Sequence, residues 1–345
     1  MQNQPTPDSA AFEISLDRTS QSYRCDRNDT LLRAGLRAGI NLAYECNVGQ
    51  CGSCKVQLLE GEVASLHAAP SVLSPRDAER GRRLACQSTP LSNCRVRFLG
   101  SRTDQGVAIA PRRSEAELVS HHDLTHDMRE FRFRTGAPAR FLPGQYALLD
   151  LPGVVGSRAY SMANLPNDDG EWHFIVRKVP DGAGTGHLFD ARAGDRVSLD
   201  APYGHAILRD TSGRNVCCIA GGSGLAPMLS IARAFDASPA YETSHLHFLF
   251  GGRTVADICG TPQLQQLSAF GQRIFFHSAV SAQDPELSGG VPQKLIHELL
   301  LDHFHDSLQA FDFYCAGPPK MIEAVTAALR ERDVSADRIR YDRFF

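Results

Sequence analysis

Four cysteines in the first quarter of the 345-residue chain constrain its fold more than any other feature. Cys46, Cys51 and Cys54 follow the spacing C-x4-C-x2-C, and Cys86 lies 32 positions beyond the third of them. Three thiolates from one loop and a fourth from a distant segment match the ligands of a plant-type [2Fe–2S] cluster. Glycines between the ligands leave room for backbone N–H groups to turn toward inorganic sulfide. The spacing therefore predicts a domain that carries one electron at a time.

Two other uses of four cysteines remain open at this point. Structural zinc sites usually pair their ligands as two short C-x2–4-C motifs, whereas three of these cysteines share one loop. Disulfides need an oxidising compartment, and residues 1–10 do not have the pattern of a secretory leader. The remaining six cysteines show no ligand spacing, and we expect ordinary thiols at Cys25, Cys94, Cys217, Cys218, Cys259 and Cys315.

The length of the chain predicts two or three domains. The formal net charge is −3, so we expect no nucleic-acid partner. No apolar run approaches the roughly 20 residues of a membrane span. We therefore expect a cytoplasmic protein that does not enter a membrane, and we expect a monomer.

Residues 11–100 are predicted to form a small α+β domain around the cysteine loop. Asn28, Asp29 and Thr30 are N-cap residue types, and Gly39 is placed to end the helix that follows them. A polar stretch over 101–113 is predicted to be a linker. The elements expected before it are strands over 12–16, 55–59 and 94–98 and one helix over 31–37.

Residues 114–212 are predicted to form a small antiparallel barrel, because alternating strands and turn residues recur through them. Within it, the motif Arg158-Ala159-Tyr160-Ser161 has a chemical logic. An arginine fork can hold a flavin phosphate, an aromatic residue two positions on lies on the same strand face, and a hydroxyl can bond the flavin ring. Further candidate cofactor-binding residues are Val176 and, at the start of a predicted helix whose free N–H groups could meet a pyrophosphate, Gly182 and Thr185.

Residues 213–345 alternate between strands and helices, and two glycine motifs follow buried strands. The apolar run over 215–220 leads into a helix from about residue 228, and a second run over 311–316 leads into another helix. Ligands bind at the carboxyl ends of strands in open α/β sheets. We therefore expect a dinucleotide site at the two motifs, and the candidate residues are Gly221, Gly222, Ser223, Gly224, Gly317, Pro318 and, in a later loop, Arg253.

All three segments together resemble the reductase components of bacterial multicomponent oxygenases. The resemblance is carried by the cysteine set, by Arg158-Ala159-Tyr160-Ser161 and by the two glycine motifs. The ending Tyr341-Asp342-Arg343-Phe344-Phe345 is similar to toluene and phenol monooxygenase reductases, and Leu84-Ala85-Cys86-Gln87-Ser88 is similar to naphthalene-type dioxygenase reductases. The resemblance covers nearly the whole chain, and it indicates the class of protein better than the oxygenase that the protein serves.

The resemblance implies a multidomain fold: a β-grasp ferredoxin domain, an antiparallel β-barrel FAD domain and an α/β parallel-sheet NAD domain. It implies one [2Fe–2S] cluster, one FAD, and NADH as the coenzyme. Electrons would pass from NADH to FAD, to the cluster, and then to the terminal oxygenase of an aromatic-hydrocarbon system or to its intermediary ferredoxin. Ser161, Tyr160 and Phe344 would take part in hydride transfer, and Phe344 or Phe345 would cover the flavin face; a C-terminal strand packed in the core is the alternative for that pair.

Two further points stay open. The family commonly has a cysteine where this chain has Ala316, and strand alternation would turn Cys315 to the opposite face. Arg253 stands alone with Asp257 near it, so we expect NADH to be preferred over NADPH.

An alternative to the oxygenase role is a stand-alone NAD(P)H:acceptor reductase or a redox-regulatory protein.

Overall fold

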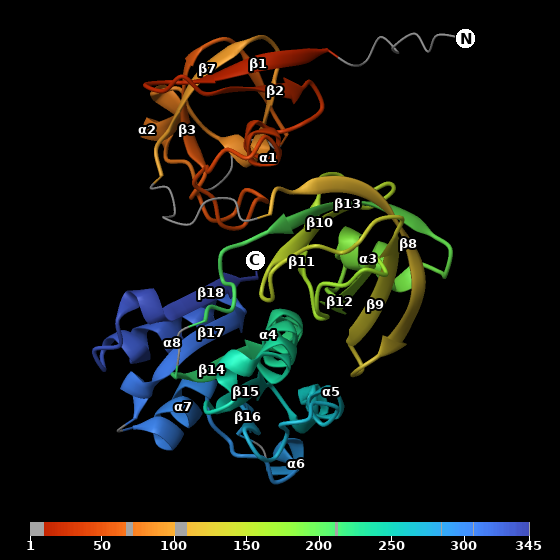
Figure 1. The fold of residues 1–345 in the computed structure, drawn as a ribbon, viewed down its shortest axis with the longest axis vertical. Helices are drawn as coiled ribbons and strands as arrows, with labels where there is room; N and C mark the ends of the chain where they lie inside the picture. Colours follow the sequence, from red (N-terminus) through yellow and green to blue (C-terminus); the bar gives the residue numbers. More distant parts are fainter. Residues whose placement is uncertain are drawn as a thin grey trace. The chain divides into compact units, whose positions relative to one another are not determined.

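The computed structural model describes residues 10–66, 72–100, 109–210, 213–283, 285–305 and 307–344. The chain forms two compact units that meet in sequence at Arg112 and Arg113 (Figure 1). The predicted linker over 101–113 falls largely outside the described residues, and the first strand of the second unit, β8, begins already at Arg112.

The first unit is a five-stranded sheet with one main helix, and its strand order is β2-β1-β7-β3-β5. β1 pairs with β7 in parallel, whereas its pairing with β2 is antiparallel. The hydroxyl of Thr30 accepts a hydrogen bond from the N–H of Arg33 and so caps α1, and Gly39 leaves the helix at φ +77°. The elements are β1 Ala11–Leu16, β2 Ser22–Asp26, α1 Leu31–Arg37, β3 Lys55–Glu60, β4 Val63–Ser65, α2 Pro75–Glu79, β5 Arg82–Leu84, η1 Ala85–Gln87, β6 Ser88–Pro90 and β7 Cys94–Phe98.

The second unit begins with a six-stranded antiparallel sheet in the order β11-β10-β13-β8-β9-β12. An isolated bridge between Met162 and Phe174 links the two ends of this order, so the sheet curls into a barrel. The rings of Phe141 and Trp172 pack in its core with centroids 5.4 Å apart. The elements are β8 Arg112–Asp123, β9 Met128–Thr135, β10 Tyr146–Asp150, β11 Arg158–Ser161, β12 Glu171–Arg177, α3 Ala183–Asp190 and β13 Arg196–Tyr203.

The rest of the second unit is a parallel sheet in the order β16-β15-β14-β17-β18. Apolar clusters lie on both of its faces, one against α4 and one against α7 and α8, as a sheet buried on both sides requires. Its elements are β14 Asn215–Gly221, η2 Gly222–Gly224, α4 Leu225–Ala237, η3 Pro239–Tyr241, β15 Leu246–Gly252, η4 Val255–Asp257, α5 Thr261–Leu264, β16 Ile274–Val280, α6 Pro285–Ser288, α7 Ile296–Phe304, η5 Leu308–Ala310, β17 Phe311–Gly317, α8 Pro319–Arg330, η6 Ala336–Arg338 and β18 Ile339–Arg343.

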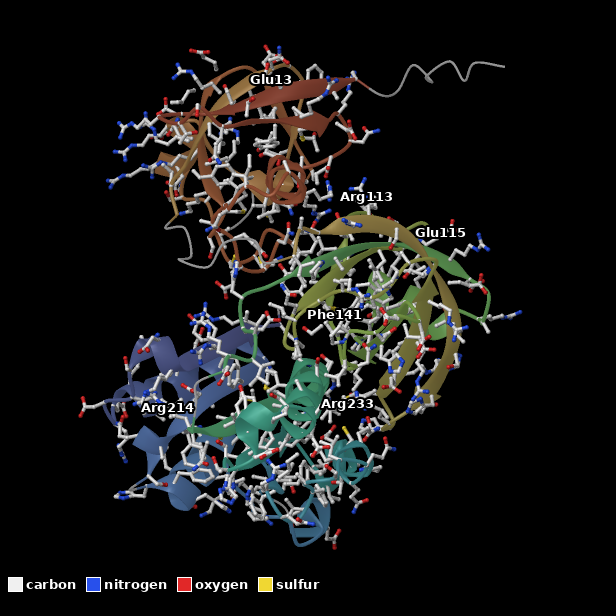
Figure 2. All side chains as sticks on the ribbon, in the orientation of Figure 1. Glu13, Arg113, Glu115, Phe141, Arg214 and Arg233 are labelled. Atoms are coloured by element: carbon white, nitrogen blue, oxygen red, sulfur yellow. The ribbon has the colours of Figure 1, made fainter. Side chains whose placement is uncertain are left out.

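Helix α4 joins the parallel sheet to the barrel (Figure 1). The hydroxyl of Ser230 donates to the carbonyl oxygen of Asn164 at 2.7 Å. Arg233, which is labelled on α4 in Figure 2, donates to the carbonyl oxygen of Ala163. These bonds bring the end of β11 next to the helix that follows the first glycine motif, so two of the predicted sites lie in one compact unit.

No helix among the described residues is long and apolar enough to cross a membrane. The predicted small α+β fold, antiparallel barrel and parallel sheet are all present, and the helix expected from about residue 228 begins at Leu225. The glycine turn η2 leads directly into α4, so the helix starts one turn earlier than the apolar pattern suggests.

Candidate electron-transfer and coenzyme sites

The four predicted cluster ligands lie in two pairs. The N–H of Cys51 donates to the Cys46 sulfur at 3.4 Å, and the N–H of Cys46 donates to the Cys51 sulfur at 3.5 Å. The sulfurs of Cys54 and Cys86 lie 3.3 Å apart. Cys51 is the half-buried member of the set, and the other three are buried.

Backbone N–H groups converge on the first sulfur pair. The N–H of Gln50 donates to the sulfur of Cys46 at 3.3 Å, and that of Ser53 donates to the sulfur of Cys51 at 3.5 Å. Hydrogen bonds from Cys46 and Ser53 to the Cys51 sulfur outweigh the effect of burial and lower the pKa of Cys51. The same contact between Cys46 and Cys51 raises the pKa of Cys46. The thiolate, which is the form that binds metal, is therefore favoured at Cys51 and disfavoured at Cys46.

The loop is supported by a buried cation that the sequence patterns did not indicate. Arg33 on α1 donates to the side-chain oxygen of Asn47 at 3.3 Å and to its carbonyl oxygen at 3.2 Å. Asn47 itself has φ +56°, and Gly49 turns the chain at φ +87°. A Cβ at Gly49 would lie 2.9 Å from the side chain of Gln87, next to Cys86, so only glycine fits there.

The arrangement fits a two-iron cluster. A single zinc ion needs its sulfur ligands around one tetrahedral centre. Among the residues that the structure describes, no three cysteine sulfurs lie within 4.8 Å of one another. Two separate sulfur pairs suit two metal atoms, each bound by one pair, as four thiolates are required for a [2Fe–2S] cluster.

In the second unit, Arg158 and the start of α3 lie against each other. A Cβ added to Gly184 would lie 3.0 Å from the side chain of Arg158. The guanidinium of Arg158 donates to three successive carbonyl oxygens, those of Val155, Gly156 and Ser157, at 3.0 to 3.3 Å. The first turn of α3 has no side-chain cap, so its N–H groups are open to an anion beside this cation.

Thr185 and Gly182 close the loop that precedes α3. The Thr185 hydroxyl accepts a hydrogen bond from the N–H of Val179 at 3.1 Å and lies 3.2 Å from the carbonyl oxygen of Gly182. The side chain of Val176 is 2 % exposed in the barrel core, so any contact with a cofactor would come from its backbone.

The strand that carries Tyr160 and Ser161 meets the end of the chain. Ser161 donates to a carboxylate oxygen of Asp342 at 3.3 Å, and Asp342 precedes the final aromatic residues by two positions. Tyr160 packs near Phe174 with ring centroids 6.4 Å apart, and burial raises the pKa of Tyr160. Phe344 donates its N–H to the carbonyl oxygen of Gly317 at 3.0 Å and packs against the apolar cluster on the α4 face. Sequence reasoning named Ser161 and missed Asp342.

Phe345 lies outside the described residues. The prediction that Cys315 and Ala316 lie on opposite faces of the sheet is confirmed. Cys315 packs in the apolar core against α7 and α8, and Ala316 packs in the apolar core against α4. Burial raises the pKa of Cys315 to about 12, which keeps its thiol protonated. Cys315 is therefore a packing residue on the face away from the glycine turn.

A cavity of about 1060 Å³ opens at the carboxyl ends of β14, β15 and β17. Five of the predicted cofactor residues line it: Gly182, Gly221, Gly222, Arg253 and Pro318. The cavity adjoins both the barrel and the parallel sheet, so a dinucleotide bound in it would contact both. Ser223, Gly224 and Gly317 belong to the same turns but are not among its lining residues.

Arg177, at the end of β12, reaches this cavity from the barrel. A Cβ built at Gly222 would lie 3.4 Å from its guanidinium. Arg177 pairs with Asp127 at 2.7 Å and with Asp257 at 3.2 Å, so it joins the barrel to the loop after β15. No sequence motif indicated Arg177, because its partners lie 50 and 80 positions away.

Asp257 shapes the loop that carries Arg253. Its carboxylate accepts hydrogen bonds from the N–H groups of Arg253 and Thr254 at 3.1 and 2.9 Å. Burial opposes the charge, but the N–H of Thr254 and the guanidinium of Arg177 outweigh it and lower the pKa of Asp257. His126 completes a group with Asp127 and Asp257 that could hold a metal ion by distance alone, although Arg177 already forms ion pairs with both carboxylates.

The fold and these sites define an iron–sulfur flavoprotein oxidoreductase. Residues 14–91 match the 2Fe-2S iron-sulfur cluster binding domain, residues 115–207 the oxidoreductase FAD-binding domain, and residues 218–327 the oxidoreductase NAD-binding domain. The chain thus has one domain for the cluster, one for FAD and one for the nicotinamide coenzyme.

Full-length relatives share this organisation. The chain is 39% identical over 328 residues to the ferredoxin–NAD(+) reductase component of the alkene monooxygenase system of Xanthobacter autotrophicus, with 94% of this chain and 98% of the relative covered. It is 38% identical to the ferredoxin–NAD(P)(+) reductase CarAd of Metapseudomonas resinovorans, with 93% and 96% covered. The solved ferredoxin reductase in carbazole 1,9a-dioxygenase aligns with a TM-score of 0.88 at 33% identity, with 97% and 99% covered. The chain belongs to this family of ferredoxin–NAD(P)+ reductase components.

Proposed function

We propose that the protein passes electrons from NADH through FAD and the [2Fe–2S] cluster to the terminal oxygenase of an aromatic-hydrocarbon hydroxylating system, or to its intermediary ferredoxin. The observation that carries this proposal is the pairing of the cluster cysteines in a chain that also holds the flavin motif and the glycine-lined cavity. The named relatives, which are components of monooxygenase and dioxygenase systems, support the same class of partner.

FAD, when bound, accepts the two electrons of a hydride and releases them singly to a one-electron carrier. In this proposal Arg158 and the open first turn of α3 hold the flavin phosphates, together with Gly182 and Thr185. The proximity of Arg158 to Gly184 supports this assignment, and charge-assisted bonds of this kind are the strong ones. Tyr160 would orient the flavin ring, with Val176 contributing its backbone.

Ser161 would hold a proton or hydrogen bond at the reacting edge of the flavin ring, and Asp342 would position the Ser161 hydroxyl. Their hydrogen bond of 3.3 Å supports this pairing. Phe344, and Phe345 after it, would exclude water from the flavin face until the nicotinamide arrives. Because Ala316 is small, it leaves space for the nicotinamide on the α4 face of β17.

The coenzyme would lie in the cavity of the second unit. Gly221, Gly222 and Ser223 would bring backbone N–H groups to its phosphates, and Gly317 and Pro318 would line the opposite side. Arg177 would add a positive charge beside Gly222, so a bound pyrophosphate would compete with Asp127 and Asp257 for this guanidinium. Gly224 would act by packing the turn against β17.

A single-turnover experiment tests the proposal. When one equivalent of NADH is mixed anaerobically with the loaded protein, we expect the flavin absorbance to fall first and the cluster absorbance to fall afterwards. The [2Fe–2S] EPR signal should appear with the second phase. A flavin that is reduced while the cluster stays oxidised would contradict electron transfer through the cluster and would support the alternative of a stand-alone reductase with a regulatory cluster.

We expect kcat/KM to be higher for NADH than for NADPH. Asp257 lies beside the N–H groups of Arg253 and Thr254, and its negative charge opposes a 2′-phosphate there. Asp257→Asn should raise kcat/KM for NADPH about tenfold relative to NADH, a change that corresponds to about 1.4 kcal/mol. Steady-state kinetics with both coenzymes measure this ratio. Arg253→Ala is the comparison variant, because loss of the cation should lower any residual activity with NADPH. A higher kcat/KM for NADPH than for NADH in the wild type would contradict the expected coenzyme preference.

We also propose that the protein acts as a monomer in the cytoplasm. Light scattering coupled to size-exclusion chromatography tests the first point, with a mass near 37.7 kDa expected. Fractionation of the source cells tests the second.

A further inference from the structure

The first unit carries a basic face next to the segments that supply the second sulfur pair, Cys54 and Cys86. Its members come from β3, α2 and β5, and they are all cations. Counting Arg80 directly after α2, these segments carry five Lys and Arg side chains and three carboxylates, Glu60, Asp77 and Glu79, although the whole chain has a net charge of −3. We define the basic face as Lys55, Arg76, Arg80 and Arg82; Lys55 and Arg82 share the sheet face that α2 covers, since both bond to Asp77.

The face adjoins the ligands directly. Lys55 follows Cys54 in the chain, and it pairs across the sheet with Leu84 at the end of β5. The next turn, η1, contains Cys86. The basic face therefore borders the segments that supply the second sulfur pair.

Only part of its charge is neutralised. Asp77 is buried between Lys55 at 3.1 Å and Arg82 at 2.7 Å, and the hydrogen bond from Arg82 is the largest of several effects that lower the pKa of Asp77. Arg76 and Arg80 project into solvent from the ends of α2. Figure 2 shows nitrogen-tipped side chains pointing outward on the side where Figure 1 labels α2. One exposed carboxylate, Glu79, offsets them in this segment.

Two other arginines of the first unit have their charges offset by carboxylates. Arg95 and Arg97 lie on the sheet, and both bond to the carboxylate of Asp17, at 3.0 and 2.6 Å. Arg95 also bonds to Glu60. A purely structural role for arginines on the β5 edge, to prevent pairing with another sheet, accounts for Arg82 and Arg83 but not for Arg76 and Arg80 on the helix.

We propose that the basic face is the docking surface for the electron acceptor, and that the acceptor is a protein that presents an acidic surface around its redox centre. The inference rests on the proposed function, because the reduced cluster is the electron donor. In the transfer, the cluster loses one electron and the acceptor centre gains it, so one NADH reduces two one-electron acceptors. A positive face speeds encounter with a negative partner and fixes its orientation.

The test uses the loaded full chain, with the double variant Arg76→Glu/Arg80→Glu. The probe is the soluble domain of cytochrome b5, a small acidic haem protein whose ferric iron takes one electron. At low ionic strength we expect the variant to reduce it with a second-order rate constant at least tenfold lower than wild type, with a matching rise in the dissociation constant from calorimetry. The difference should shrink as salt screens the charges, since the Debye length falls to about 10 Å at 0.1 M.

Arg24→Glu/Arg27→Glu is the matched control, because these exposed arginines lie on and just after β2, the opposite edge of the same sheet. It changes the net charge equally, and we expect less than a twofold effect. An equal effect of both double variants would overturn the proposal, since net charge alone would then explain it. Basic cytochrome c gives the reverse test: the Arg76/Arg80 variant should reduce it no more slowly than wild type.

The same mixing experiment separates this inference from the proposed function. NADH should reduce the cluster at the wild-type rate in both variants without any acceptor. If the Arg76→Glu/Arg80→Glu variant slows that internal step and leaves cytochrome b5 binding unchanged, the basic face serves transfer within the chain and the docking proposal is wrong. If NADH fails to reduce the cluster even in the wild type, the proposed function itself fails.

Discussion

Cys51→Ser is expected to abolish NADH-driven reduction of cytochrome c while leaving most of the ferricyanide reductase activity. The sulfur of Cys51 belongs to the first ligand pair, 3.5 Å from the N–H of Cys46, and serine supplies no thiolate there. Ferricyanide can take electrons directly from flavin, whereas the one-electron path to a protein acceptor needs the cluster. Absorbance and EPR spectra of the purified variant should show bound FAD and no normal [2Fe–2S] signal.

Cys94→Ser is the control for this experiment. Cys94 is a buried cysteine of the same unit, but its sulfur bonds to the carbonyl oxygens of Glu62 and Ser92 and not to a cluster ligand. We expect this variant to keep the cluster and the cytochrome c activity. A normal EPR signal in Cys51→Ser, or the loss of the signal in both variants, would contradict the ligand assignment.

Local patterns were sufficient to predict much of the fold. The helix over 31–37 follows from Thr30 as its cap and from Gly39 at positive φ, both of which depend on neighbouring residues alone. The opposite faces of Cys315 and Ala316 follow from strand alternation, which tertiary context does not change. The cysteine spacing predicted the ligands, and the structure adds that their sulfurs are paired.

Long-range contacts were beyond the reach of sequence patterns. Ser161 and Asp342 are 181 positions apart, and their contact exists because the end of β11 and the end of β18 meet in the second unit. Arg177 reaches the glycine turn from another sheet, and Arg33 supports a loop from α1. In each case a charged or polar residue acquires its place from packing between elements, and neither periodicity nor spacing records such packing.

The role of Gly224 also depends on a long-range contact that the sequence patterns did not predict, and its substitution should cause a large loss of stability. Sequence reasoning grouped it with the residues that approach the coenzyme phosphates, whereas a Cβ at this position would overlap the carbonyl oxygen of Ala316 and lie 2.9 Å from the N–H nitrogen of Gly317. These are backbone atoms of β17, which cannot rotate away. We expect Gly224→Ala to destabilise the second unit by about 3 kcal/mol or more, which corresponds to a fall in Tm of about 10 °C.

Gly224→Ala should also weaken binding of the coenzyme, because displacement of the turn moves Gly221 and Gly222, which line the cavity. Thermal unfolding followed by circular dichroism and by flavin fluorescence measures the loss, and titration with NAD+ measures binding. Gly136→Ala is the matched control: a Cβ at Gly136 meets no atom within 4 Å, so its Tm should stay near that of the wild type. A Gly224→Ala protein with unchanged Tm but weakened NAD+ binding would reverse the assignment, since Gly224 would then act on the phosphates themselves and not through its packing against β17.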